Sequence, residues 1–156
     1  METSLLSRRL GKKAALRDAF HAAGLRLTRQ RLAIYRELTG RYDHPDVDTL
    51  FKAVKPRIPR MSLFTVYRTM NALENAGMIW RVATWKGHAR YDGNVEPHAH
   101  FLCEECGSIH DLEVRDMDSL RRSITQDLGH VRRVDLMFYG KGPVCQAHER
   151  RTAADE

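Results

Sequence analysis

A short segment in the second half of the chain holds its densest group of metal-binding side chains. His98 and His100 are two residues apart, and Cys103 and Cys106 follow as a Cys-x-x-Cys pair. Side chains two residues apart on a strand project to the same side, so one metal ion can bind both imidazoles. A Cys-x-x-Cys pair in a turn presents two thiolates with the spacing found at tetrahedral zinc sites. The segment therefore predicts metal binding.

A second pair of zinc-binding side chain types lies close to the C-terminus. Cys145 and His148 repeat the same spacing, and with Cys103 and Cys106 they form a three-cysteine, one-histidine set that structural zinc accepts. The alternative is that Cys103 and Cys106 form a redox pair. The two glutamates between them disfavour the thiolate that a redox cysteine needs. We therefore expect a structural zinc ion.

The elements that would position these side chains begin with helices followed by a hairpin. Apolar residues recur at helical spacing, and Pro56 and Pro59 interrupt the pattern. The predicted helices are residues 4–23, a segment between Thr28 and Gly40, a short helix after His44-Pro45, and Ser62–Ala76; the predicted strands are Met78–Trp85 and His88–Tyr91. This order is that of a winged helix-turn-helix domain.

The predicted helix Ser62–Ala76 has two different faces. Val66, Met70 and Leu73 form an apolar stripe. The outward face carries side chains that suit the major groove of DNA, where both base edges and phosphates must be reached: Ser62, Thr65, Tyr67 and Arg68. We expect Tyr67 and Arg68 to make the contacts and the two hydroxyls to anchor the start of the helix. The alternative is an ordinary solvent-exposed face.

The second half predicts a small mixed module. Strands are expected over Ala99–Leu102, Ser108–Glu113 and Val131–Tyr139, with a helix over 115–128 and a polar tail from Arg150. A core this thin gains stability from a metal ion or a partner subunit. The expected fold class is therefore α+β, with a DNA-binding domain over 1–91, an α/β dimerisation domain over 92–150 and a tail over 151–156.

Charge divides the chain in the same way. Of its 156 residues, 26 are Lys or Arg and 20 are Asp or Glu, which gives a net charge of +6. Residues 1–91 hold 18 basic and 7 acidic residues, a balance of +11, whereas residues 92–156 hold 8 and 13, a balance of −5. A basic half that meets a polyanion and an acidic half that binds cations explain this asymmetry.

Composition excludes several other classes. The chain is 42% hydrophobic and 29% charged, which is ordinary for a globular protein. No apolar run reaches the roughly 18 residues that span a membrane, and the N-terminus lacks the apolar core of a secretory signal. Three cysteines, an odd number, argue against a disulfide framework. We expect a cytoplasmic protein with no membrane partner.

Four ordered motifs resemble the ferric uptake regulator (Fur) family. They are His44-Pro45, the helix segment Ser62–Arg68, the segment His98–Gly107, and Tyr139-Gly140 followed by Val144-Cys145-Gln146. The resemblance covers roughly residues 16–148. It implies a homodimeric winged-helix repressor that binds operator DNA, with a metal-sensing site at the hinge, and it assigns Arg26 to the minor groove.

Within that family the chain is most similar to the peroxide-sensing (PerR) branch. The resemblance assigns the sensing metal to five ligands: His44, Asp92, His98, His100 and Asp111. Iron-sensing relatives generally have glutamates where Asp92 and Asp111 stand, so the aspartates favour peroxide sensing through oxidation of a histidine ligand. Three imidazoles and two carboxylates also suit Fe(II) or Mn(II) on chemical grounds.

The chain departs from the family pattern at its second cysteine pair, which is Cys145-x-x-His148 here, behind an insertion of residues 141–143. Three alternatives stay open. One is an iron- or manganese-responsive uptake regulator with the same fold. Another is a zinc hydrolase using His98 and His100, although the sequence offers no candidate base, so we expect no enzyme. The third is a zinc-stapled binding module in which Asp92 and Asp111 are idle.

Overall fold

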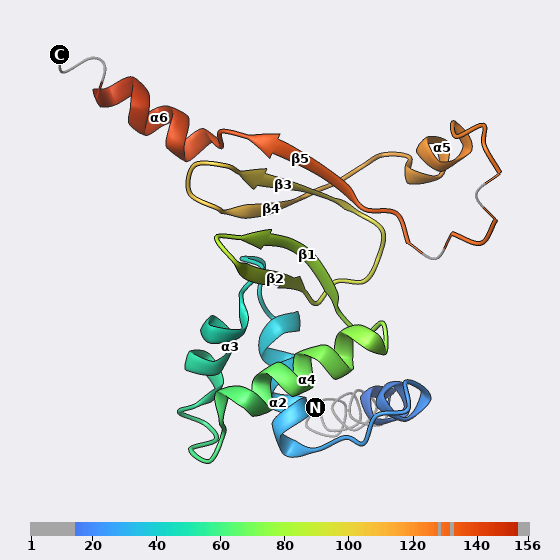
Figure 1. Cartoon of the computed structure of the whole chain (residues 1–156), viewed down its shortest axis with the longest axis vertical. Helices are drawn as coiled ribbons and strands as arrows, with labels where there is room; N and C mark the ends of the chain where they lie inside the picture. Colours follow the sequence, from blue (N-terminus) through green and yellow to red (C-terminus); the bar gives the residue numbers. More distant parts are fainter. Residues whose placement is uncertain (1–14, 128, 132, 153–156) are drawn as a thin grey trace, which may run out of the picture.

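The computed structural model describes residues 15–127, 129–131 and 133–152. The helices of the first half gather at one end of the molecule, a two-stranded hairpin lies next to them, and a second sheet follows (Figure 1). The α+β fold class is confirmed. Residues 15–22 are helical; the earlier part of the predicted first helix, 4–14, lies outside the described residues.

Three helices build the core of the first half. They are α2 (Arg29–Thr39), α3 (Val47–Val54) and α4 (Leu63–Asn75). Each starts at a side-chain N-cap that accepts a hydrogen bond from the first turn, and these caps are Thr28, Asp46 and Ser62. The predicted stripe of α4 is buried: Val66, Met70 and Leu73 are fully inside. The opposite face of α4 is therefore left to solvent.

A hairpin follows as the wing. Strands β1 (Trp80–Trp85) and β2 (His88–Asp92) pair antiparallel. They meet at Lys86-Gly87, where both residues have positive φ, as a tight turn requires. The main-chain N–H of Tyr91 donates to Pro45 O at 3.1 Å, which ties the wing to the loop before α3. Winged-helix architecture is thus present as the pattern predicted.

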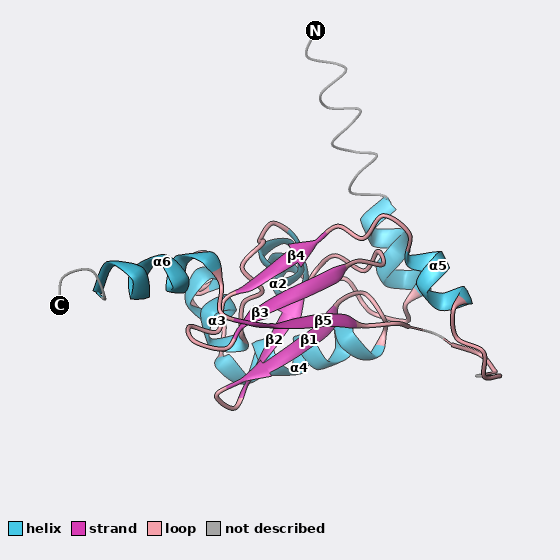
Figure 2. Cartoon of the chain, turned by 90° about the horizontal axis from the view of Figure 1, so that it is seen from above, coloured by secondary structure: helices cyan, strands magenta, loops and turns pink. Residues whose placement is uncertain are grey.

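The second sheet has the order β4-β3-β5. Its central strand β3 (Ala99–Cys103) pairs antiparallel with β4 (Ile109–Leu112) and parallel with β5 (Leu136–Gly140). Helices α5 (Met117–Arg122) and α6 (Pro143–Thr152) lie at opposite ends of this sheet (Figures 1 and 2). No helix in the described part of the chain is long and apolar enough to cross a membrane.

The structure differs from expectation mainly at three elements of the second half. The helix expected over 115–128 is only α5, because Leu120 and Ile124 of its apolar stripe are 40% and 43% exposed and have no core to pack on in a single chain. The strand expected over Val131–Tyr139 begins at Leu136. Helix α6 was not expected, and it continues through residues 151–152 of the predicted tail; the rest of that tail lies outside the described residues. Pro143 at its first position is the start signal that was missed.

Candidate metal centre

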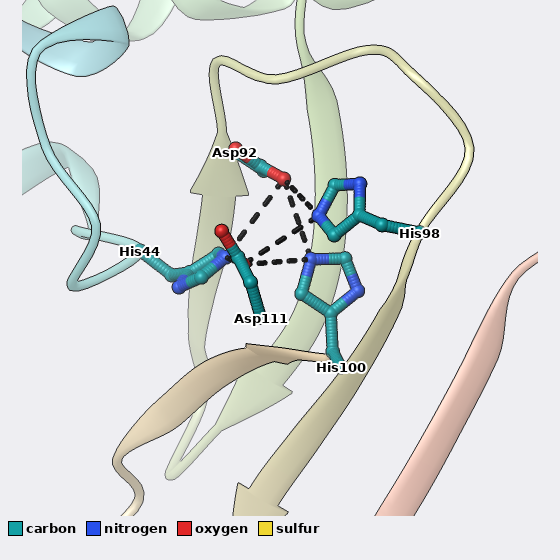
Figure 3. Close-up of side chains that lie close together, drawn as sticks. All are labelled: His44, Asp92, His98, His100 and Asp111. Carbon is teal, nitrogen blue, oxygen red and sulfur yellow. Dashed lines mark hydrogen bonds and ion pairs between the residues drawn. The ribbon is translucent and has the colours of Figure 1, made fainter. Parts of the chain in front are cut away.

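Five side chains from both halves of the molecule converge on one point. His44 comes from the loop before α3, Asp92 ends β2, His98 directly precedes β3, His100 lies on β3, and Asp111 lies on β4 (Figure 3). One ligand atom from each lies within 4.8 Å of all the others. The five residues that the resemblance assigned to a sensing metal are therefore brought together.

Local structure explains how these side chains meet. His98 and His100 are two residues apart and project to one side of the sheet. Asp111 is the register partner of His100 across the β3–β4 pair, so the sheet itself sets their separation. His44 reaches the cluster from the helical half with φ at 48°, a left-handed conformation that is uncommon outside glycine.

Carboxylate oxygens stand opposite imidazole nitrogens throughout the cluster. His44 Nε2 lies 2.8 Å from Asp111 Oδ1, and His98 Nε2 lies 2.9 Å from Asp92 Oδ2. His100 Nε2 lies 3.3 Å from that same Asp92 oxygen. Every nitrogen involved is an Nε2 atom, so the three rings share one orientation toward the centre.

Three imidazole nitrogens of His44 and His98 have no hydrogen bond although they are buried. Among the described residues, they are His44 Nδ1, His44 Nε2 and His98 Nε2. His44 is only 2% exposed, and its close approach to Asp111 lacks the angles of a hydrogen bond. An orphaned buried nitrogen is costly unless another partner takes its lone pair. A cation at the centre would be that partner for the two Nε2 atoms, so the donor set fits a metal ion.

The protonation states also suit a metal ion. Burial lowers the pKa of His44 below its ordinary value, which keeps the ring neutral. Burial alone would raise the pKa of Asp92, but hydrogen bonds from His100 and the Asn94 N–H, together with the neighbouring imidazoles, bring it below its usual value. A neutral imidazole and an ionised carboxylate are the forms that bind metals.

A second cluster contains the three cysteines. Cys103 ends β3, Cys106 follows in the next turn, and Cys145 lies on α6; their sulfur atoms lie within 4.8 Å of one another. The N–H groups of Cys106 and Gly142 lower the pKa of Cys103 to about 6, whereas the Cys106 and Cys103 side chains together with burial raise the pKa of Cys145 to about 12. The two neighbouring cysteines thus oppose ionisation of Cys145, and a divalent cation would remove that opposition.

His148, the expected fourth ligand of this cluster, lies three residues after Cys145 on α6 and is exposed. It is not among the ligand atoms that come within 4.8 Å of one another. The structure therefore brings three of the four expected zinc ligands together.

Comparison with known proteins decides the family. The family model described as "Ferric uptake regulator family" matches residues 22–139. The chain belongs to the ferric uptake regulator family.

Relatives with different sensing roles resemble this Fur-family chain to a similar degree. The peroxide-responsive repressor PerR of Staphylococcus epidermidis (strain ATCC 12228 / FDA PCI 1200) is 32% identical over 80% of this chain and 83% of its own. The structure of a zinc-bound manganese uptake regulator is 30% identical, with a TM-score of 0.61 over 81% of this chain and 98% of that one. The structure of the Campylobacter jejuni peroxide stress regulator is 27% identical, with a TM-score of 0.62 over 83% of this chain and 94% of that one.

The residues expected to contact DNA lie away from both clusters, in the helical half. Ser62 caps α4 and its hydroxyl lies 2.8 Å from Thr65 Oγ1, while Tyr67 and Arg68 are exposed on the same helix. Arg26 is exposed in the loop before α2. The face of α4 that carries Tyr67 and Arg68 is therefore exposed and free to contact another molecule.

Sequence reasoning missed two features of the site region. Phe64 is 69% exposed on α4, and the Arg68 guanidinium lies 5.7 Å from its ring centre. The signal available in the sequence was that Phe64 is apolar but lies outside the buried stripe of α4. Arg90, on β2, binds three main-chain carbonyls near the five-residue cluster. No spacing rule indicated that role.

Proposed function

We propose that this Fur-family protein is a metal-dependent transcriptional repressor that binds operator DNA as a homodimer and is not an enzyme. The observation that carries this proposal is the five-residue cluster, in which His44 from the helical half meets donors at the wing and on the second sheet. A metal ion there would fix the angle between the DNA-binding half and the dimerisation half. Chromosomal DNA as the partner favours a cytoplasmic location.

Two metals are proposed, one at each cluster. Fe(II) or Mn(II) suits the nitrogen and oxygen donors of the regulatory cluster, which we define as His44, Asp92, His98, His100 and Asp111. Zinc suits the thiolate cluster of Cys103, Cys106 and Cys145, with His148 as the fourth ligand after a turn of its side chain. The fit of each set rests on its donor chemistry.

DNA binding is proposed for the exposed face of α4. Tyr67 and Arg68 would contact bases and phosphates, Ser62 and Thr65 would bind phosphate near the helix start, and Arg26 would enter the minor groove. The +11 balance of residues 1–91 supports a polyanionic partner.

A second copy of the chain is the proposed partner of the β5 side of the sheet. Strand β5 is an edge strand, and Phe138 and Tyr139 on it are 48% and 62% exposed. Unpaired main-chain groups beside exposed aromatic side chains favour strand or face pairing with another chain.

Peroxide is the proposed signal. Bound Fe(II) would supply a one-electron reductant for hydrogen peroxide beside the ligand imidazoles. Asp111 is 37% exposed, so a small oxidant can approach the cluster from its side, whereas His44 and His98 hold buried nitrogens at the centre. Oxidation of either imidazole would destroy a ligand and release DNA. The two aspartates support this branch over the glutamate-containing iron sensors.

The alternative is an iron- or manganese-responsive uptake regulator. It is favoured by the likeness to the zinc-bound manganese uptake regulator, which is as similar in sequence as the peroxide repressors. In that case the metal would bind reversibly and no side chain would be modified.

Mass spectrometry after peroxide treatment separates the two. Protein loaded with Fe(II) should gain one oxygen on His44 or His98 and lose DNA binding, whereas protein loaded with Mn(II) should keep both imidazoles and its DNA. Asp111→Glu should slow the oxidation, because the longer side chain alters coordination. Oxygen found only on Cys or Met, or equal protection of DNA binding by both metals, would favour the uptake regulator.

A further inference from the structure

Arg90 joins three segments that are far apart in the sequence. From β2, its guanidinium donates to Asp43 O at 2.8 Å, to His44 O, and to Gly107 O at 2.9 Å. Asp43 and His44 belong to the loop before α3, and Gly107 directly follows the second cysteine of the Cys-x-x-Cys turn. One side chain thus connects the loop that carries a regulatory ligand with the turn that carries two cysteines.

The loop end of this connection needs external support. His44 has a φ of 48°, a conformation that costs an L-residue free energy and persists only where surrounding contacts hold it. The Arg90 hydrogen bonds to Asp43 O and to His44 O act on both sides of its Cα atom, and the Tyr91 N–H bond to Pro45 O adds a further contact from the same strand. Strand β2 therefore holds the ligand residue in its strained conformation.

The cysteine end is equally constrained. Gly107 has a φ of +72°, and a Cβ atom placed on it would lie 2.2 Å from Trp85 Nε1 on the wing. Its N–H donates to Cys103 O at 2.8 Å, which closes the cysteine turn. Any change in the fold of that turn would therefore move the Gly107 carbonyl away from Arg90.

We propose that Arg90 is a positioning residue that couples the cysteine cluster to the regulatory cluster. An ordered cysteine turn presents the Gly107 carbonyl, Arg90 binds it, and the same guanidinium holds His44 at the metal centre. Zinc at the thiolates would thereby raise the affinity of the regulatory cluster for its own metal. This inference rests on the two metal sites proposed above.

Mn²⁺ titration of the zinc-loaded, full-length protein tests the positioning role. Arg90→Lys keeps the charge, but a single ammonium cannot span three carbonyls. Mn²⁺ affinity should fall about 10–100-fold, as for other residues that orient ligands, while zinc content and dimer mass stay unchanged. Arg81→Lys is the matched control, because Arg81 lies on the wing, pairs with Glu74, and should leave Mn²⁺ affinity within about twofold.

If Arg90→Lys does not fold, the Mn²⁺ affinity of Gly107→Ala tests the same positioning role. This substitution leaves Arg90 in place but forces Gly107 away from Trp85. The same loss of Mn²⁺ affinity, with zinc retained, supports the inference. Unchanged Mn²⁺ affinity in the folded Arg90→Lys protein, or in Gly107→Ala, overturns it.

A double-mutant cycle tests the coupling itself. His148→Ala, which should weaken zinc binding without unfolding the protein, should weaken Mn²⁺ binding in the wild-type background, and it should weaken it much less when Arg90 is already lysine. Full additivity overturns the coupling. If the zinc-loaded wild-type protein binds no Mn²⁺, the proposed function fails together with this inference, whereas wild-type binding with unaffected Arg90 variants defeats the inference alone.

Discussion

The two clusters differ in how much of the protein builds them. The regulatory cluster draws ligands from residues 44 to 111, on a loop, the wing and two strands, and its imidazoles and carboxylates already stand around one centre. The cysteine cluster belongs to the second half alone; main-chain N–H groups lower the pKa of Cys103, whereas the neighbouring thiols and burial raise the pKa of Cys145. The first is positioned by the fold, whereas in the second a bound cation would remove the opposition to ionisation of Cys145.

This difference assigns the clusters different tasks. A site assembled from both halves can report its occupancy as a change in the angle between them. A metal bound within one half can only stabilise the fold of that half. In the proposed function, regulation would therefore belong to the five-residue cluster, and stability would belong to the cysteines.

Loss of a buried cysteine should produce the largest effect. Cys103→Ser removes a ligand that is fully inside and ends the central strand β3, so we expect loss of zinc, of the dimer and of cooperative folding. Structural zinc contributes on the order of 10 kcal/mol to such modules. Zinc analysis, size-exclusion chromatography and circular dichroism measure this.

His148→Ala sharpens the same prediction. Because His148 is exposed and outside the group of three sulfur atoms, its loss should weaken zinc binding without unfolding the protein. A folded, dimeric, zinc-free Cys103→Ser variant would show that the cysteine cluster is not structural.

Removal of a regulatory ligand should leave the fold intact. His44→Ala should reduce Mn²⁺ affinity more than about 100-fold, a larger loss than for residues that merely orient ligands, with zinc content unchanged. His110→Ala is the control. His110 lies on the same strand as Asp111, but its ring contacts Ser108 and is not part of the cluster. Isothermal titration calorimetry distinguishes them. Equal Mn²⁺ affinities for the two variants would remove His44 from the site.

DNA binding should change without either cluster changing. Arg68→Ala removes an exposed guanidinium and opens no cavity, so operator affinity should fall by about 1–3 kcal/mol while both metals still bind. Arg122→Ala, at the far end of the molecule on α5, should have no effect. Fluorescence anisotropy at several salt concentrations measures both. A salt-insensitive complex would contradict the assigned orientation.

The smallest effect concerns pH. Burial holds the pKa of His44 below its ordinary 6.5, so the unfolded chain takes up this proton before the folded protein does. The free energy of unfolding of the protein without regulatory metal should therefore decrease as pH falls below about 6.5, and His44 should contribute no pH dependence above it. Denaturant midpoints for wild type and His44→Gln measure this. Identical pH slopes would show that His44 is not buried as a neutral ring.

The sequence predicted the first half of the fold well. N-caps, glycine stops and the Val66, Met70, Leu73 stripe are local signals, and each corresponds to an element of the structure. The second half was harder to predict, because several of its apolar residues are exposed in the single chain and do not mark a buried helix face. Leu120 and Ile124 suggested a long helix, yet α5 ends at Arg122.

The five-residue cluster came from the resemblance more than from spacing. Only His98 and His100 carry a local signal; His44, Asp92 and Asp111 meet them through pairing of distant strands and a loop. Arg90 could not be predicted at all, because its partners are main-chain carbonyls that leave no trace in residue types.

The central claim is that one ion between the halves controls DNA binding. A DNA duplex that binds the zinc- and Mn²⁺-loaded protein is first selected from a random pool. The affinities of the wild-type protein and of His44→Ala for this duplex are then measured with and without Mn²⁺. We expect Mn²⁺ to strengthen DNA binding by the wild-type protein at least tenfold and to leave DNA binding by His44→Ala weak. Equal binding by zinc-loaded wild type with and without Mn²⁺ would contradict it.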